Sequence, residues 1–271
     1  MILFPNAKIN IGLFVTSKRP DNYHNIETVF LPVKKLSDVL EVINSPTSQD
    51  IFTTSGINIS GDLNNNLVLL ALKKMREIAS IPPLQIHLHK IIPSGAGLGG
   101  GSSDAAFMFR LLNEQFNVGL STEELETLAK EIGADCPVFI QNKTVFAKGV
   151  GNEFNEISLP LKEHWLQIVI PTIHITTANA YKNIIPTLPK VSLQQKIKSP
   201  IESWKDIIIN DFEADVFKKH SELNHIKNNF YENGAIFSSL SGSGSSIYGI
   251  FKDEPNIVWN ANYIVHTEKI Y

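Results

Sequence analysis

Hydrophobic and polar residues alternate in two stretches of the first half of the chain. Between Ala7 and Val15 every odd position is apolar, while Lys8 and Asn10 lie on the opposite side of the pattern. A period of two predicts a strand, here with a cation and an amide on its polar face. The segment LQIHLHKI, residues 84–91, alternates in the same way and predicts a strand with one face toward solvent.

Helical spacing of apolar residues follows each of these patterns. Residues 66–79 predict an amphipathic helix, and the asparagines 64–66 are suited to cap its N-terminus. Residues 102–116 predict a second helix, whose first residues Ser102, Ser103 and Asp104 we expect to cap it.

The segment STEELETLAKEIG predicts a third helix. Ser121 and Glu124 have the spacing of a capping box, and Gly133 is a natural C-terminal stop. Ala134 and Asp135 follow directly, and an aspartate at such a place is most often a turn or capping residue.

The rest of the chain predicts a mixture of short strands and helices. Strands are expected near 26–30, 38–43 and 166–171, a hairpin at 144–157, helices at 177–185 and 221–231, a proline-rich surface segment at 185–200, and two strands within 235–251 joined by a glycine and serine loop at 241–246. This pattern is of the α+β class, and we predict two domains, residues 1–155 and 156–271.

Composition excludes several classes of function. With 24 Lys and Arg against 27 Asp and Glu and no basic run, the chain lacks the charge of a nucleic-acid-binding protein. The single cysteine, Cys136, cannot form an internal disulfide, and no Cys or His group has zinc-ligand spacing. Without a signal, transit or membrane segment, we expect a soluble, cytoplasmic protein with no membrane partner.

The segment PSGAGLGGGSSDAA, residues 93–106, is the main candidate for chemistry. Gly95, Gly97 and Gly100 match the G-x-G-x-x-G string of dinucleotide-binding folds, but the preceding strand alternates and the next element is a second helix, unlike those folds. No lysine follows the glycines, which excludes a Walker A loop. A flexible linker is also disfavoured, because a strand and a capped helix enclose the segment.

A glycine loop that leads into a helix N-terminus is suited to bind phosphate. The glycines allow backbone N–H groups to approach an anion, and the helix adds unpaired N–H groups and the positive end of its dipole. Ser102 or Ser103 can add a hydroxyl donor or a magnesium ligand.

Three short motifs of the chain resemble those of a known superfamily. PSGAGLGGGSS resembles the phosphate loop of the GHMP kinases, which include galactokinase and the homoserine, mevalonate and phosphomevalonate kinases; PNAKINIGL and LSGSGSS resemble the first and third motifs. The resemblance implies a two-domain fold, an N-terminal ribosomal protein S5 domain 2-like domain and a C-terminal ferredoxin-like domain, with the active site in the cleft between them. It also implies ATP with Mg²⁺.

The resemblance carries roles to particular residues. Asp135 matches the residue that accepts or orients the attacking hydroxyl, and Lys8 the cation beside the transferred phosphate, a pair that suits phosphoryl transfer. Expected ATP-binding residues are Pro93, Ser94, Gly95, Ala96, Gly97, Leu98, Gly99, Gly100, Gly101, Ser102 and Ser103, together with Asn66 and Lys90.

Three further segments resemble one branch of the superfamily, the kinases of the non-mevalonate isoprenoid route whose substrate is a cytidine-diphosphate-linked methylerythritol. These are RPDNYHNIET, GADCPVF and TTANAYKN. Members usually have glycine before the Tyr-His pair; Asn22 stands there in this chain and tolerates the same left-handed backbone. The resemblance implies substrate-binding roles for Asn10, Tyr23, His24, Thr177, Tyr181, Gly242 and Ser243.

The implied activity is ATP-dependent phosphorylation of the C2 hydroxyl of that substrate. Two alternatives stay open at this point: another GHMP kinase of small alcohols, of the mevalonate or homoserine type, and a nucleotide-binding relative without catalysis. Intact Lys8 and Asp135 argue against the second. The residue pattern does not distinguish a monomer from a homodimer.

Overall fold

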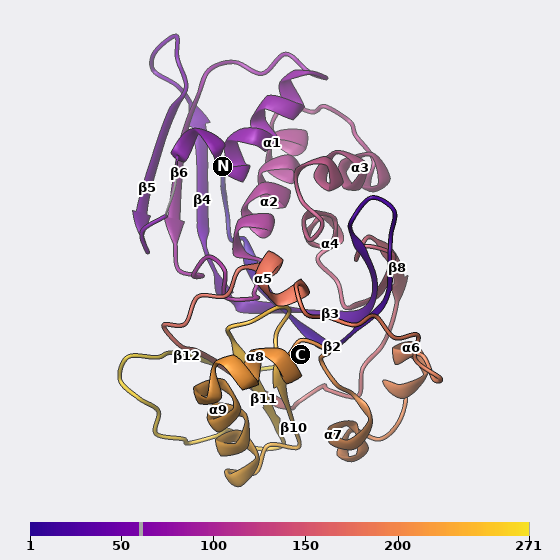
Figure 1. Ribbon diagram of the computed structural model, residues 1–271. Coiled ribbons are helices and arrows are strands. Elements are labelled where there is room, and N and C mark those ends of the chain that lie inside the picture. Colours follow the sequence, from indigo (N-terminus) through magenta and orange to yellow (C-terminus); the bar gives the residue numbers. More distant parts are fainter. Residues whose placement is uncertain (60–61, 271) are drawn as a thin grey trace. The chain divides into compact units, whose positions relative to one another are not determined.

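The computed structural model describes residues 1–59 and 62–270, and the chain forms two compact units that are interleaved in sequence (Figure 1). Unit 1 comprises Met1–Lys8, Pro32–Ser94 and Gly99–Lys143, and unit 2 comprises Ile9–Leu31, Gly95–Leu98 and Thr144–Tyr271. These units are defined by packing, so a single division of the sequence after residue 155 stays a prediction.

Unit 1 contains a four-stranded sheet in the order β1-β4-β6-β5. Its strands are β1 (Ile2–Leu3), β4 (Val39–Asn44), β5 (Ile51–Gly56) and β6 (Leu84–Lys90). In β6 every second side chain is buried, which confirms the alternation read from the sequence and also turns Lys90 toward the buried face. On the other face, the rings of His87 and His89 each share a hydrogen bond with the Ser55 hydroxyl.

The helices of unit 1 lie beside this sheet, with α1 and α2 next to each other (Figure 1). They are η1 (Leu63–Asn65), α1 (Leu67–Arg76), α2 (Gly100–Gln115), α3 (Thr122–Ile132) and α4 (Cys136–Gln141). The cap of α1 by Asn66 and the capping box of Ser121 and Glu124 are confirmed.

The predicted cap of α2 is wrong. The helix begins at Gly100, and its N-cap is Gly99, which has a left-handed backbone (φ 72°) and forms no side-chain cap. Glycine adopts this conformation without steric cost, so the helix starts two residues before Ser102. Ser102, Ser103 and Asp104 therefore lie in its first turns.

Unit 2 contains two further four-stranded sheets, in the orders β2-β3-β7-β8 and β10-β11-β9-β12. Their strands are β2 (Asn6–Lys18), β3 (His24–Ser37), β7 (Val145–Lys148), β8 (Glu153–Glu156), β9 (Trp165–Ile170), β10 (Phe237–Leu240), β11 (Ile247–Phe251) and β12 (Ile264–Lys269). The first residues of β2 and the last of β3 belong to unit 1. Both faces of β2 are buried over its first ten residues, so Lys8 and Asn10 lie on no solvated face.

The helices of unit 2 are short, apart from α9. They are α5 (Thr177–Tyr181), α6 (Leu193–Lys196), η2 (Ile201–Ser203), α7 (Trp204–Ile207), α8 (Glu213–Lys219) and α9 (Ser221–Glu232). The helix predicted for 177–185 thus ends at Tyr181. Apolar side chains of α8, α9, β10 and β11 form the buried core of this unit, including Phe230, Leu240 and Phe251.

The prediction of a mixed helix and sheet protein is confirmed. None of the helices found among residues 1–59 and 62–270 has the length and apolar character that crossing a membrane requires.

Candidate active site

Lys8 and Asp135 form an ion pair within unit 1. The Lys8 ammonium lies 3.3 Å from Asp135 Oδ2, and the two side chains are 4% and 38% exposed. Lys8 is a buried residue of β2, while Asp135 immediately precedes α4. A buried cation is thus paired with a carboxylate that solvent reaches.

Asp135 is not a capping residue. It has the N-cap position of α4, but its backbone is helical and its side chain makes no cap hydrogen bond. Next to it, burial raises the pKa of the Cys136 thiol to about 12, partly offset by a hydrogen bond with Ser102. The thiol is therefore protonated near neutral pH and unsuited as a nucleophile.

The glycine loop runs from β6 into the N-terminus of α2, as the sequence predicts. Gly95, Gly97 and Gly99 all have positive φ, between 71° and 77°. At Gly99 an added Cβ would lie 2.9 Å from the Phe139 ring and 3.1 Å from Lys8 Cε. The Lys8 side chain therefore packs directly against Gly99, the N-cap residue of α2. Its cation lies at the N-terminal end of this helix, the end that attracts anions.

Within unit 2, the segment Gly95–Leu98 is hydrogen-bonded to the second glycine-rich loop. The Ser241 hydroxyl donates to Gly97 O (2.9 Å), and the Ser246 N–H donates to Ala96 O (3.1 Å). A Cβ at Gly97 would overlap Ser241 O. The two loops thus pack closely, and at Gly97 only glycine has room.

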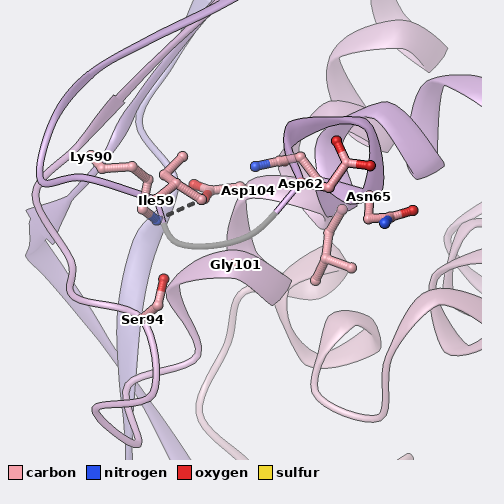
Figure 2. A pocket seen from close by; sticks show the side chains of 9 residues that line it. Ile59, Asp62, Asn65, Lys90, Ser94, Gly101 and Asp104 are labelled. Carbon is pink, nitrogen blue, oxygen red and sulfur yellow. Dashed lines mark hydrogen bonds and ion pairs between the residues drawn. The ribbon is translucent and has the colours of Figure 1, made fainter. Parts of the chain in front are cut away.

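Unit 1 also has a cavity of about 310 Å³ beside the start of the loop and the first turn of α2. Figure 2 shows polar side chains around it, several of them carboxylates, amides or hydroxyls. Its lining residues are Ile59, Asp62, Asn65, Asn66, Leu67, Lys90, Ser94, Gly101 and Asp104. Four of these, Asn66, Lys90, Ser94 and Gly101, are among the residues that the resemblance assigns to ATP.

The ammonium group of Lys90, although it lines this cavity, is already paired with carboxylates of the protein. It is 4% exposed and forms ion pairs with Asp38 and, at 2.7 Å, with Asp104. Burial alone would lower its pKa, but the charges of Asp104 and Asp38 outweigh burial and raise it. For Asp104, burial raises the pKa to about 8, although Lys90 opposes that shift. The Lys90 ammonium is therefore already engaged by two carboxyl groups of the protein.

The two serines of α2 differ in their surroundings. Ser103 is fully buried, and its hydroxyl has no hydrogen-bond partner among the described residues. Ser102 is half-buried and lies next to Cys136 and Gly133. Of the two, Ser102 is better placed to donate to a phosphate or to ligate magnesium. Over residues 1–59 and 62–270, no cluster of three His, Cys, Asp or Glu side chains is suited to a metal ion.

Magnesium nevertheless fits this donor set. Mg²⁺ usually keeps several waters and is held by substrate phosphates with few protein ligands. One hydroxyl at the first turn of α2, that of Ser102, is consistent with such a site.

Two of the predicted base-binding residues, His24 and Tyr181, are in contact within unit 2. The His24 ring stacks on the Tyr181 ring, with centroids 4.8 Å apart and planes inclined by 22°, and Tyr181 meets the edge of Phe212. Tyr23 is 61% exposed, and Asn22 has the left-handed backbone (φ 67°) expected of it. Burial, with the positive charge of Lys18, lowers the pKa of His24, so its ring is neutral at pH 7.

The remaining substrate candidates lie around the second glycine loop. The hydroxyls of Thr177 and Ser243 are 3.4 Å apart. Asn10 donates to Thr28 Oγ1 (2.9 Å), and its Oδ1 faces Gly242, where an added Cβ would lie 3.3 Å away. The structure therefore brings these predicted residues together within unit 2, and it places Asn10 among buried groups.

Asp38 and Asp104 are the functional candidates that sequence reasoning missed. Asp104 was expected to cap α2, and Asp38 to begin a strand. A signal for both exists: Leu84, Ile86, Leu88 and Lys90 share the buried face of β6, and a lysine there requires carboxylate partners.

Family models match both halves of the chain. Residues 66–143 match the model of the GHMP kinases N terminal domain, and residues 197–263 match the model of the GHMP kinases C terminal.

Full-length relatives are similar as well. The chain is 49% identical over 267 residues to the 4-diphosphocytidyl-2-C-methyl-D-erythritol kinase of Bacteroides thetaiotaomicron, covering 97% of each chain. It is 44% identical over 256 residues to the enzyme of the same name from Cytophaga hutchinsonii, covering 94% of each chain.

Solved structures agree with this relationship. A crystal structure of 4-(cytidine 5'-diphospho)-2C-methyl-D-erythritol kinase has a TM-score of 0.77 and 29% identity, over 92% of this chain and 90% of that chain. Methanococcus jannaschii mevalonate kinase, at 16% identity over 93% of this chain and 90% of that one, shares the fold with a TM-score of 0.68. The chain therefore belongs to the GHMP kinases and, within them, to the family of the 4-diphosphocytidyl-2-C-methyl-D-erythritol kinases.

Proposed function

We propose that this kinase transfers the γ-phosphate of ATP to the C2 hydroxyl of 4-diphosphocytidyl-2-C-methyl-D-erythritol, giving the 2-phosphate and ADP in non-mevalonate isoprenoid synthesis. The observation that carries the proposal is the Lys8–Asp135 ion pair next to the glycine cap of α2, in a chain 49% identical to a kinase of that name. Phosphoryl transfer needs a positioned nucleophile and stabilised phosphoryl charge, and this pair supplies both.

Phosphate binding is assigned to the glycine loop and the N-terminus of α2. The first N–H groups of a helix have no intrahelical partner, and the dipole is positive at this end. With Gly99 as N-cap, Gly100, Gly101 and Ser102 present such groups, and Lys8 adds a full positive charge beside them. The cation that a Walker loop takes from its own lysine comes here from β2.

Asp135 receives the acceptor hydroxyl. Its carboxylate is reached by solvent, is not used as a helix cap, and is paired with Lys8. The carboxylate accepts a hydrogen bond from the hydroxyl and aligns its oxygen for in-line attack. Since the transition state of phosphoryl transfer is loose, alignment contributes more than early removal of the proton.

Magnesium, when bound with ATP, neutralises charge on the phosphate oxygens. Ser102 is the residue of this chain assigned to hold it. The cavity lined by Asn66, Ser94 and Gly101 is assigned to the nucleoside end of ATP.

Tyr23, His24 and Tyr181 are assigned to the cytosine. Stacking on aromatic side chains stabilises a bound flat base, and the neutral His24 ring has one hydrogen-bond donor and one acceptor for the edge of the base. The stacking of His24 on Tyr181 supports a surface built for flat rings. Mevalonate and homoserine have no ring that could stack on this surface, which argues against assignment to the other small-alcohol kinases.

A coupled assay of ADP release tests this assignment. Wild-type protein is given ATP and, in separate reactions, the cytidyl substrate, mevalonate or homoserine. We expect turnover with the cytidyl substrate alone. Turnover with mevalonate or homoserine but not with the cytidyl substrate would overturn the substrate assignment, and no turnover with any alcohol despite ATP binding would favour a non-catalytic relative.

A further inference from the structure

Three buried titratable side chains of unit 1 have no role in the phosphoryl transfer step proposed above. Asp38, Lys90 and Asp104 are exposed by 0%, 4% and 2%, respectively. The Lys90 ammonium lies between the two carboxylates, in ion pairs with Asp38 Oδ2 and Asp104 Oδ2. We call these residues the buried triad.

Asp38 holds the entry of the glycine loop. Its second oxygen, Oδ1, accepts the backbone N–H groups of Ile91 (2.6 Å) and Ile92 (2.9 Å), the two residues directly before Pro93. Asp38 is itself fixed, because its own N–H donates to Pro5 O at 2.8 Å. The chain therefore leaves β6 along a path that one carboxylate determines.

The same carboxylate reaches the exit of the loop through Lys90. Lys90 donates to Asp104 in the first turns of α2. At Gly100, an added Cβ would lie 3.3 Å from Lys90 Nζ, so the lysine packs closely under the start of the helix. Asp38 is thus bonded to both ends of the loop between Ile91 and Gly100, directly at the entry and through Lys90 at the exit.

Stability alone does not explain these charges. Burying ions costs several kcal/mol each, and replacing a buried ion group with packed apolar residues is often neutral or stabilising. What apolar residues cannot do is accept two backbone N–H groups and join them to a helix by directional bonds. The directional bonds are the feature that bears on function.

We propose that Asp38 is a positioning residue for the phosphate-binding loop. By accepting the Ile91 and Ile92 N–H groups and by holding Lys90 against Asp104, it fixes the separation between the loop entry and the α2 N-terminus. That separation sets how closely the backbone N–H groups converge on a phosphate. The inference rests on the proposed function, in which this loop binds ATP.

The test compares Asp38→Asn with a matched control, Asp50→Asn. Asp50 lies at the other end of β6, where it accepts the Leu84 N–H at 2.8 Å and pairs with Arg76. Like Asp38, it is a carboxylate that accepts backbone N–H and pairs with a cation, although it has one backbone partner where Asp38 has two. It lies at the end of β6 that is remote from the loop. Both variants are measured for ADP affinity by calorimetry, for the KM values of ATP and of the cytidyl substrate, and for thermal stability.

We expect Asp38→Asn to weaken ADP binding and raise the ATP KM by about tenfold, the effect of losing a hydrogen bond to a charged group. The KM of the cytidyl substrate stays within about twofold of wild type. Asp50→Asn lowers stability but leaves both nucleotide constants within about twofold. A nucleotide affinity equal in Asp38→Asn, Asp50→Asn and wild type would overturn the proposal.

A second variant covers the case in which Asp38→Asn does not fold. Asp38→Glu keeps the charge for Lys90, but its longer side chain cannot accept both backbone N–H groups, those of Ile91 and Ile92, in the same geometry. ADP affinity lowered about tenfold in this folded variant supports the role, and unchanged affinity overturns it. Wild-type protein that binds ADP but phosphorylates no alcohol would contradict the proposed function while leaving this comparison valid.

Discussion

The ammonium group of Lys8 lies 3.3 Å from the carboxylate of Asp135, although 127 positions separate the two residues in sequence (135 minus 8). Lys8 is almost fully buried, whereas Asp135 is 38% exposed. The pair therefore combines a buried cation with a carboxylate that solvent reaches. This geometry gives each residue a separate and measurable role.

Asp135→Asn should retain ATP binding and lose turnover. The amide keeps the size of the side chain but cannot accept the hydroxyl proton, so we expect kcat to fall by about 10²- to 10⁴-fold while ADP affinity stays within about twofold. Single-turnover kinetics and calorimetry measure the two quantities. Near wild-type turnover would show that Asp135 has another role.

Lys8→Met should lower kcat by about 10²- to 10³-fold, because it removes a charge that stabilises the phosphoryl oxygens. If Lys8 and Asp135 act as a unit, the double variant loses little more activity than the worse single variant. Activity losses that multiply in the double variant would indicate independent roles.

Tyr181→Ala should raise the KM of the cytidyl substrate by about tenfold, because it removes an aromatic face worth roughly 1 kcal/mol or more. Tyr181→Phe keeps the ring and is the matched control, with constants close to wild type. The ATP KM should be unchanged in both. Equal increases in both KM values for Tyr181→Ala would argue against base stacking.

Asp104 should make stability depend on pH. Burial raises its pKa to about 8 from an ordinary 3.8, so the folded chain holds a proton that the unfolded chain releases. The stability this contributes is complete below about pH 4 and is lost as the pH rises through about 8. Asp104→Asn lacks the proton and should show a smaller fall in the free energy of unfolding between about pH 5 and pH 9, measured by urea denaturation. An equal fall in both proteins would contradict the raised pKa.

Ser121→Ala separates stability from activity. It removes the hydroxyl that accepts the Glu124 N–H in the capping box of α3, at a cost of about 1 kcal/mol. The free energy of unfolding should fall by that amount, and kcat and both KM values should not change. A change in either KM would indicate that α3 influences the site.

Elements with strong periodicity could be predicted from the sequence. The alternation in β6 and the capping signals of α1 and α3 are local, and local residues determine them. The start of α2 could not be placed, because a left-handed Gly99 allows the helix to begin before the serines that are suited to cap it. The short α5 ends at Tyr181, whose ring stacks on His24, and periodicity does not encode such a contact between residues distant in sequence.

The candidate site could be predicted only in part for a related reason. Motifs point to Lys8, Asp135 and the glycine loop individually, and their order along the chain points to the family. The partners of Lys90 depend on long-range packing: Asp38 is 52 positions away and Asp104 is 14. A lysine on the apolar face of a strand indicates that such partners exist but not which residues they are.

Phosphorus NMR of the purified product tests the central proposal most directly. The C2 of 2-C-methylerythritol bears no hydrogen, so a phosphate ester at this position has no proton three bonds away from phosphorus. We expect wild-type protein with ATP and the cytidyl substrate to form ADP and a product whose new phosphomonoester signal is a singlet in the proton-coupled spectrum. A doublet or triplet would place the phosphate on another hydroxyl, and no new signal while ATP is intact would contradict the kinase activity on this substrate.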